Sequence, residues 1–187
     1  MADLLAEVGD LSTFLGEDIE PDVEQLLLEL ATAGVQVSAG QQIVEVVDDT
    51  VELIGGRDKW LPLPQRPVSA VASVEIDGSV VTDYTLFGSR LWRRQGWAPT
   101  YKPSTVKIVY THGYPAGDQG LQLARQATLM TAAQMRANPT GATGFGIDDY
   151  REQYSHAADR IAGEVPRSLG NALRQRYGVG VWTLALG

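Results

Sequence analysis

Two runs of apolar residues at helical spacing open the chain. The first consists of Leu4, Val8, Leu11 and Leu15. The second consists of Val23, Leu26, Leu27, Leu30 and Ala31. Gly16 is a natural stop for the first helix, Pro21 suits the first position of the second, and Gly34 or Gly40 can end it. Residues 1–40 are therefore predicted to form a helical hairpin with a shared apolar face.

The middle of the chain changes to β-branched and alternating patterns. Residues 43–47 and 50–54 are strand-like, and Asp48-Asp49 between them predicts a turn, so we expect a hairpin. Leu61-Pro62-Leu63-Pro64 is expected to be extended, because proline disfavours both helices and central strands. Asp77-Gly78 follows another strand-like run and has the residue types that a tight hairpin turn requires.

Two further strands and two further helices complete the pattern. Residues 84–91 and 105–110 predict strands, and residues 121–135 and 166–177 predict helices. Between these helices, residues 140–146 are rich in Gly and Thr and are predicted to form a flexible loop. The next residues, 147–154, fit either an extended segment or a helical turn.

These patterns predict an α+β fold with an N-terminal helical hairpin, a central antiparallel β insertion, two C-terminal helices and an extended C-terminal tail. We expect a single domain over residues 1–177. It is helical in residues 1–40, a β unit in 41–112 and mainly helical in 118–177. A flexible, apolar tail follows over residues 178–187.

Charge is distributed unevenly along the chain. The net charge is −8. Residues 1–60 hold 14 acids and 2 bases, a net of −12, and residues 61–187 hold 9 acids and 13 bases, a net of +4. An acidic first third argues against sequence-independent DNA binding, which depends on neutralising phosphates. The alternative is that acidic helices are simply solvated.

The sequence offers no recognisable catalytic motif. The chain has no cysteine, and it contains neither a phosphate-binding Gly-Lys-Ser/Thr loop nor a Gly-x-Ser-x-Gly elbow. Gly141, Gly144 and Gly146 follow a predicted helix rather than a strand, so they lack the context of a dinucleotide site. No run of about 18 apolar residues predicts a membrane span.

The histidines and acidic pairs have ordinary structural explanations. His112 lies between a strand and a glycine, and His156 has no second histidine one turn away. Asp48-Asp49 and Asp148-Asp149 do not have the spacing of a calcium loop and are common turn pairs. We therefore predict no catalytic residue, no metal ligand and no cofactor.

Two segments are candidates for binding a partner. The first is a basic and aromatic stretch comprising Arg90, Trp92, Arg93, Arg94 and Trp97, with Tyr101 and Lys102 close behind. It suits a protein interface, a nucleic-acid contact or simple packing, and we expect it on an exposed part of the β unit. The second is the tail, with Val179, Val181, Trp182, Leu184 and Leu186. An apolar terminus either folds back on its own core or docks on a partner.

The order and spacing of these features resemble the head-to-tail adaptor proteins of long-tailed double-stranded DNA phages, particularly those of actinobacterial hosts. The resemblance rests on Asp10-Leu11 with Phe14-Leu15-Gly16, Leu61–Pro64, Pro67-Val68, Val71, Val74, Asp77-Gly78, Tyr84, the Arg/Trp stretch, Val106-x-Ile108-x-Tyr110-x-His112-Gly113, Tyr150, Tyr154 and the helix from Leu169 to Tyr177. It covers most of the chain and concerns order and spacing, not a catalytic signature.

The resemblance implies a non-enzymatic structural subunit of a virion. Such adaptors form a ring, usually twelvefold, beneath the portal protein, where they extend the DNA channel and dock a tail-side connector or stopper protein. It also implies contacts with neighbouring adaptor subunits, passage of packaged DNA without sequence-specific binding, no membrane association, and assembly in the host cytoplasm. The acidic first third would face either the channel or solvent. The alternatives are a DNA-binding accessory module built on the Arg/Trp stretch and a small accessory enzyme.

Overall fold

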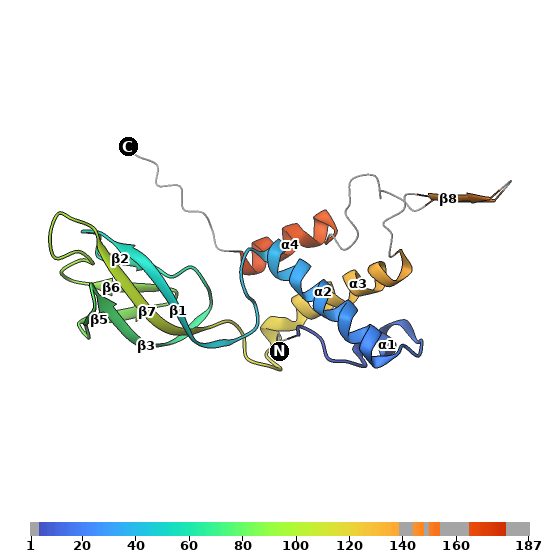
Figure 1. The fold of residues 1–187 in the computed structure, drawn as a ribbon, viewed down its shortest axis with the longest axis horizontal. Helices are drawn as coiled ribbons and strands as arrows, with labels where there is room; N and C mark the ends of the chain where they lie inside the picture. The colour runs from blue at the N-terminus through green and yellow to red at the C-terminus, as the bar shows by residue number, and fades with distance from the viewer. Residues whose placement is uncertain (1–3, 139–143, 148–149, 154–164, 179–187) are drawn as a thin grey trace. The chain divides into compact units, whose positions relative to one another are not determined.

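The computed structural model describes residues 4–138, 144–147, 150–153 and 165–178. They form two compact units (Figure 1). The helical unit is built from residues up to Gly40 and from Gln119 to Gly178, and the β unit contains Gln41–Asp118. The predicted α+β fold is confirmed. That residues 1–177 act as one domain, and that 178–187 form a docking tail, stay predictions.

The helical unit is built around α2. Its elements are α1 (Asp10–Leu15), α2 (Pro21–Ala39), the 3-10 turn η1 (Gln119–Leu121), α3 (Gln122–Ala137) and α4 (Arg167–Tyr177). α2 packs against α3 and α4, and α1 packs against α3 (Figure 1). Gly16 and Gly40 end the first two helices with φ angles of 68° and 74°, as C-terminal glycines commonly do.

Two details of the predicted hairpin are wrong. The first helix begins at Asp10, not near Leu4, because Gly9 adopts a φ of 101° that no helix allows. The predicted stripe on the second helix is also split between two faces. Leu28, Ala31 and Val35 are buried in the core of the unit. Val23, Leu26 and Leu30 are exposed.

The β unit consists of two antiparallel sheets that share one core. The larger has the order β1 (Val46–Gly55), β7 (Ser104–His112), β3 (Val68–Ile76) and β4 (Ser79–Val80). The smaller has the order β2 (Trp60–Pro62), β6 (Arg90–Arg93) and β5 (Tyr84–Phe87). Alternate side chains from both sheets, with Leu63 and Trp97 from the loops, fill the core.

The turn at Asp77-Gly78 is confirmed, and two other strand predictions are wrong. Asp77 and Gly78 have φ angles of 50° and 81° and join β3 to β4. Asp48-Asp49 makes no hairpin turn. Asp48, with a φ of 54°, lies in a bulge of the single strand β1. The run 84–91 is not one strand either, because it turns at Gly88 into a β5–β6 hairpin.

The predicted loop at 140–146 and the ambiguous segment after it contain a short β-hairpin. Strand β8 (Gly144–Ile147) pairs antiparallel with β9 (Tyr150–Gln153). The extended alternative for residues 147–154 is therefore the correct one for Ile147 and for Tyr150–Gln153. The acidic pair Asp148-Asp149 lies between these strands in sequence, outside the described residues.

Candidate partner-binding site

The small three-stranded sheet has one face in the core and one face outward. Leu61, Leu91 and Leu86 are paired across its strands on the inner side, and the first two are buried. Residues directly opposite each other share a face, so their sequence neighbours point outward. The outward residues, here called the outer face, are Trp60, Pro62, Thr85, Phe87, Arg90 and Trp92.

The outer face carries an exposed aromatic pair. Trp60 is 43% exposed and Phe87 is 55% exposed, and their ring centroids lie 5.7 Å apart in an edge-on arrangement. Trp92 is half-buried beside Trp60, and Arg90 is exposed at the start of β6. Exposed aromatic rings next to arginine are the composition expected of an interface anchor.

Arg93 and Trp97, both predicted to be exposed, stabilise the β unit instead. The Nε of Arg93 lies 2.8 Å from Oδ1 of Asp83, and another of its nitrogens donates to the carbonyl of Gly96 at 2.9 Å. The hydrogen bond from Arg93 lowers the pKa of Asp83. The exposure predicted for Trp97 is wrong: its ring is 1% exposed, and its Nε1 donates to the Lys59 carbonyl at 3.1 Å.

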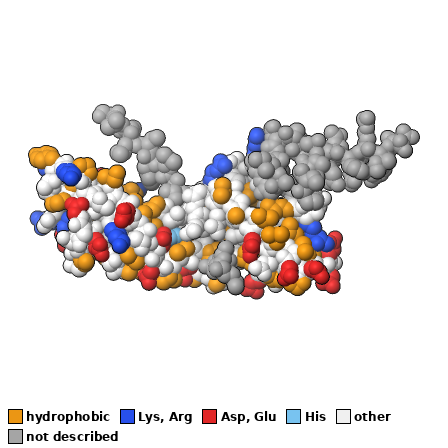
Figure 2. Space-filling view, in the orientation of Figure 1, with side chains coloured by type: hydrophobic (Ala, Val, Ile, Leu, Met, Phe, Trp, Pro, Cys, Tyr) orange, Lys and Arg blue, Asp and Glu red, His pale blue; other side chains and the backbone are white. Residues whose placement is uncertain are grey.

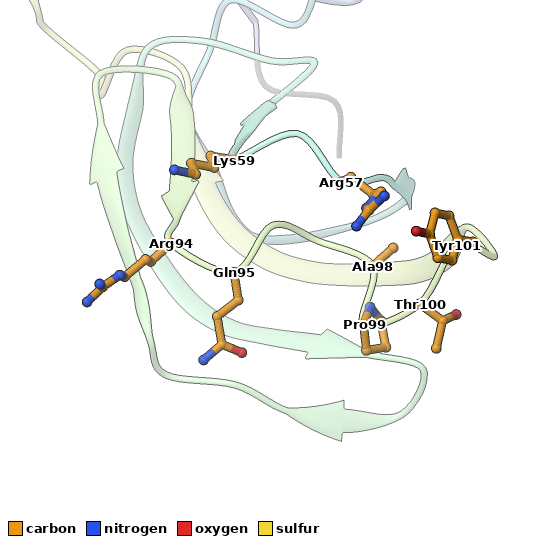
Figure 3. Close-up of a pocket in the computed structure, with 8 residues that line it drawn as sticks. All are labelled: Arg57, Lys59, Arg94, Gln95, Ala98, Pro99, Thr100 and Tyr101. Carbon is orange, nitrogen blue, oxygen red and sulfur yellow. The ribbon is translucent and has the colours of Figure 1, made fainter.

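A basic pocket lies at the end of the β unit that carries this stretch. It has a volume of about 300 Å³ and is lined by Arg57, Lys59, Arg94, Gln95, Ala98, Pro99, Thr100 and Tyr101. The guanidinium of Arg57 stacks 4.4 Å from the ring centroid of Tyr101, a cation–π contact. Figure 3 shows this pair at one end of the pocket and Lys59 and Arg94 at the other. The lining contains three cations and no carboxylate.

The structure thus distributes the predicted binding residues over three environments. Arg90 and Trp92 lie on the outer face, Arg94 lines the basic pocket, and Arg93 and Trp97 hold the unit together. That any of them contacts a partner stays a prediction. The tail residues Val179, Val181, Trp182, Leu184 and Leu186 lie outside the described residues.

Arg57, Lys59 and Trp60 were not predicted as site residues. The sequence carries one signal for the two cations, since they are the only Lys or Arg in an otherwise acidic first 60 residues. What brings them to Arg94 is the pairing of β2 with β6, which sets Trp60 opposite Trp92. That pairing joins segments about thirty positions apart and is not visible in the local pattern.

His112 is enclosed within the larger sheet. Its ring is fully buried, its Nε2 lies 3.1 Å from Oδ2 of Asp49, and it stacks 5.1 Å from the ring of Tyr110. A ring without solvent access cannot meet a substrate, so we assign it a structural position next to the β1 bulge. His156 lies outside the described residues.

The described part of the chain contains neither a metal-binding cluster nor a membrane-spanning helix. No group of three His, Cys, Asp or Glu side chains is placed to hold a metal ion there. Nor does that part contain a helix with the length and apolar character needed to cross a bilayer.

Comparison with known proteins gives a likeness of fold. No protein-family model and no curated protein matches the chain. A chain in the neck of an empty gene transfer agent particle, computed with C6 symmetry, is similar with a TM-score of 0.59 and 18% identity, over 98% of this chain and 96% of that one.

Two further structures of such particles show the same likeness. A chain of the native virion has a TM-score of 0.56 at 18% identity, covering 96% of this chain and 92% of that one. A chain in the native neck, computed with C12 symmetry, has a TM-score of 0.52 at 14% identity, covering 98% of both chains. At these identities the likeness establishes a common fold over nearly the whole length.

Proposed function

We propose that this chain is a structural head–tail adaptor of a phage-like particle, one subunit of a ring in the neck. The observation that carries the proposal is the end-to-end likeness of fold to a chain from the neck of a gene transfer agent particle, with 98% and 96% of the two chains covered. The order and spacing of the sequence features support the same family independently, since they resemble phage head-to-tail adaptors.

In this proposal the subunit works by assembly and not by chemistry. The ring lies beneath the portal, extends the DNA channel, and presents a surface to a tail-side connector or stopper protein. The C6 and C12 symmetries of the two neck structures support a ring with a multiple of six copies. A ring forms when each subunit repeats one contact between two different patches of its surface.

The exposed surface of the β unit supports a role in binding. The outer face places Trp60 and Phe87 in solvent beside Arg90, a combination that costs stability or solubility unless a partner covers it. We assign this face to the tail-side protein. The apolar residues 179–187 are proposed to dock on the portal, as an extended segment that adds to a sheet edge or fills a groove.

The proposal is tested by measuring mass with and without the portal protein of the same particle. Native mass spectrometry of the mixture is expected to show complexes whose copy number of this chain is six or twelve. A chain lacking residues 179–187 should keep the melting temperature of the full chain and lose the complex. A full-length chain that never joins the portal, at concentrations where the portal itself is a ring, would contradict the proposal.

A further inference from the structure

The three cations of the basic pocket are left without an acidic partner in the described part of the β unit. Arg57 stacks on Tyr101, and neither Lys59 nor Arg94 forms an ion pair with any described residue. All three are exposed, and Gln95 and Thr100 add polar side chains to the same lining. A pocket of about 300 Å³ lies at the small end of the range for ligand pockets and has room for a few side chains. Its chemistry selects carboxylate or phosphate groups.

The helical unit carries the opposite charge. Residues 1–40 contain nine Asp or Glu and no Lys or Arg. Figure 2 shows acidic side chains gathered over α1 and the beginning of α2. Asp18 and Glu20 lie in the segment that joins these helices, and Asp22 lies in the first turn of α2. Residues 17–22, where these three acids occupy alternate positions, are here called the acidic loop. All three are exposed, and none forms an ion pair within the described ranges.

The acidic loop is held in a fixed conformation. Ile19, between two of its acids, is only 5% exposed and belongs to the core of the helical unit. Gly16 ends α1 immediately before the loop, and Pro21 begins α2 within it. A loop anchored at its centre and at both ends presents its carboxylates with little loss of conformational entropy on binding.

We propose that the basic pocket of one copy receives the acidic loop of a second copy, and that this contact joins neighbours in the ring. The inference deepens the proposed function and rests on it. A ring requires two different patches on each chain that fit one another, and these two patches are opposite in charge and lie on different units. Complementary charge at such a contact directs encounter and orientation.

DNA is the other polyanion that the pocket could meet, and the observations favour it less. Duplex binding relies on a track of many cations along the backbone, and here three cations converge on one pocket. The chain as a whole carries a net charge of −8, which opposes the approach of a nucleic acid.

The test is a charge swap in the full chain, followed by sedimentation equilibrium at low salt. One variant carries Arg57→Glu with Arg94→Glu, and the other carries Asp18→Lys with Asp22→Lys. Each alone is expected to self-associate about tenfold more weakly than the wild type or worse, because like charges meet at the contact. An equimolar mixture of the two should regain association, since every contact in an alternating assembly is then complementary. The control, Arg174→Glu with Arg176→Glu on α4, changes the net charge by the same amount as the pocket variant, lies outside both patches, and should associate like the wild type.

The remaining outcomes overturn the proposal. The first is that the mixture associates no more strongly than either variant alone. The second is that the control associates as weakly as the pocket variant. The third is that both the wild type and the mixture stay monomeric at all concentrations. Binding of a duplex oligonucleotide that is lost only in the pocket variant would assign the pocket to phosphates instead. None of these results decides whether the chain joins the portal, which the mass measurement tests separately. Melting temperatures equal to the wild type ensure that the variants are folded.

Discussion

The carboxylate of Glu24 accepts the backbone N–H of Leu11 at 2.8 Å, so that a side chain of α2 caps the beginning of α1. The same oxygen accepts the N–H groups of Gly9 and Ser12, and the other oxygen accepts the Ser12 hydroxyl. Glu24 is 1% exposed. Because Gly9 at the N-cap has no side chain to offer, the free N–H groups of the short helix obtain their acceptor from a neighbouring helix.

Replacing this carboxylate should destabilise the protein. Glu24→Gln keeps one acceptor oxygen but removes the charge that strengthens four hydrogen bonds, and we expect a loss of about 1–3 kcal/mol in the free energy of unfolding. Urea denaturation monitored by circular dichroism measures it. Glu29→Gln on the same helix is the matched control and should change the free energy by less than about 0.5 kcal/mol. Equal effects of the two substitutions would contradict the capping role.

The difference between wild type and Glu24→Gln should depend on pH. Burial raises the pKa of Glu24, but the hydrogen bonds from Ser12, Gly9 and Leu11 lower it by more. The pKa therefore lies below the ordinary value of 4.5. A lowered pKa in the folded state stabilises the protein above the unfolded pKa, and this contribution disappears as the pH falls through the folded pKa. The difference between the two proteins should therefore shrink as the pH falls below 4.5 and through the folded pKa, and a constant difference from neutral pH down to about pH 3 would contradict this linkage.

Trp97 should be a stability residue and not a binding residue. Its ring is buried in the core of the β unit, and its Nε1 is bonded to the Lys59 carbonyl. Trp97→Ala is expected to cost about 3–5 kcal/mol of unfolding free energy, the range for large-to-small changes in a core. Trp97→Phe should cost less, but more than a volume change alone, because it removes one of the two hydrogen bonds that the Lys59 carbonyl accepts, the other coming from the backbone N–H of Arg93. A Trp97→Ala protein that melts within a few degrees of the wild type would show that the core closes without the indole.

The sequence predicted correctly those turns and helix ends that depend only on residues adjacent in the chain. The Asp77-Gly78 turn and the stop at Gly16 follow from φ angles that few residues adopt, and of the two predicted alternatives, Gly34 and Gly40, it is Gly40 that ends the second helix. Asp48-Asp49 has a similar signature, yet it forms a bulge, because the pairing of β1 with β7 continues past it. Whether such a pair turns the chain is decided by a partner strand about sixty positions away.

The environment of each candidate binding residue could not be predicted from the sequence. Trp92 and Trp97 stand in the same stretch. The register of β6 with its neighbours sets Trp92 partly outward, and the loop after β6 brings Trp97 into the core. Glu24 reads as one more solvated acid in an acidic helix, and its role appears only when α1 packs beside α2. The sequence pattern thus left out the contributions that tertiary contacts make, and the partner-binding role of the segment stays a prediction.

Tyr110 should make the protein less stable at high pH. Burial raises the pKa of Tyr110 to about 12, and the nearby Asp49 carboxylate raises it as well. A raised pKa in the folded state means that stability is intact below the unfolded value, near 10, and falls as the pH rises toward 12. In the Tyr110→Phe protein the free energy of unfolding should fall less steeply with pH in this range, by about 1.4 kcal/mol per pH unit. Urea unfolding between pH 9 and 12 measures it, and parallel curves for the two proteins would refute the assignment.

The outer face should be required for binding the tail-side protein and little needed for folding. Trp60 and Phe87 touch edge-on in solvent, so removing both rings leaves the core formed by Leu61 and Leu91 in place. We expect Trp60→Ala with Phe87→Ala to cost about 1 kcal/mol of unfolding free energy, from the lost ring contact. Truncated anchors typically cost about 2 kcal/mol or more in binding, so affinity for the tail-side protein should fall at least about thirtyfold.

The matched control for this pair is Ile54→Ala, which removes an 81% exposed apolar side chain from β1, outside the outer face. It should leave both stability and affinity near the wild-type values, since an isolated exposed residue neither packs nor anchors. Isothermal calorimetry with the purified tail-side protein gives the affinities, and thermal melts give the stabilities. Unchanged affinity in the aromatic variant, with a loss of stability close to that of Trp97→Ala, would place both rings in the core. The surface for the tail-side protein would then have to be sought elsewhere on the chain.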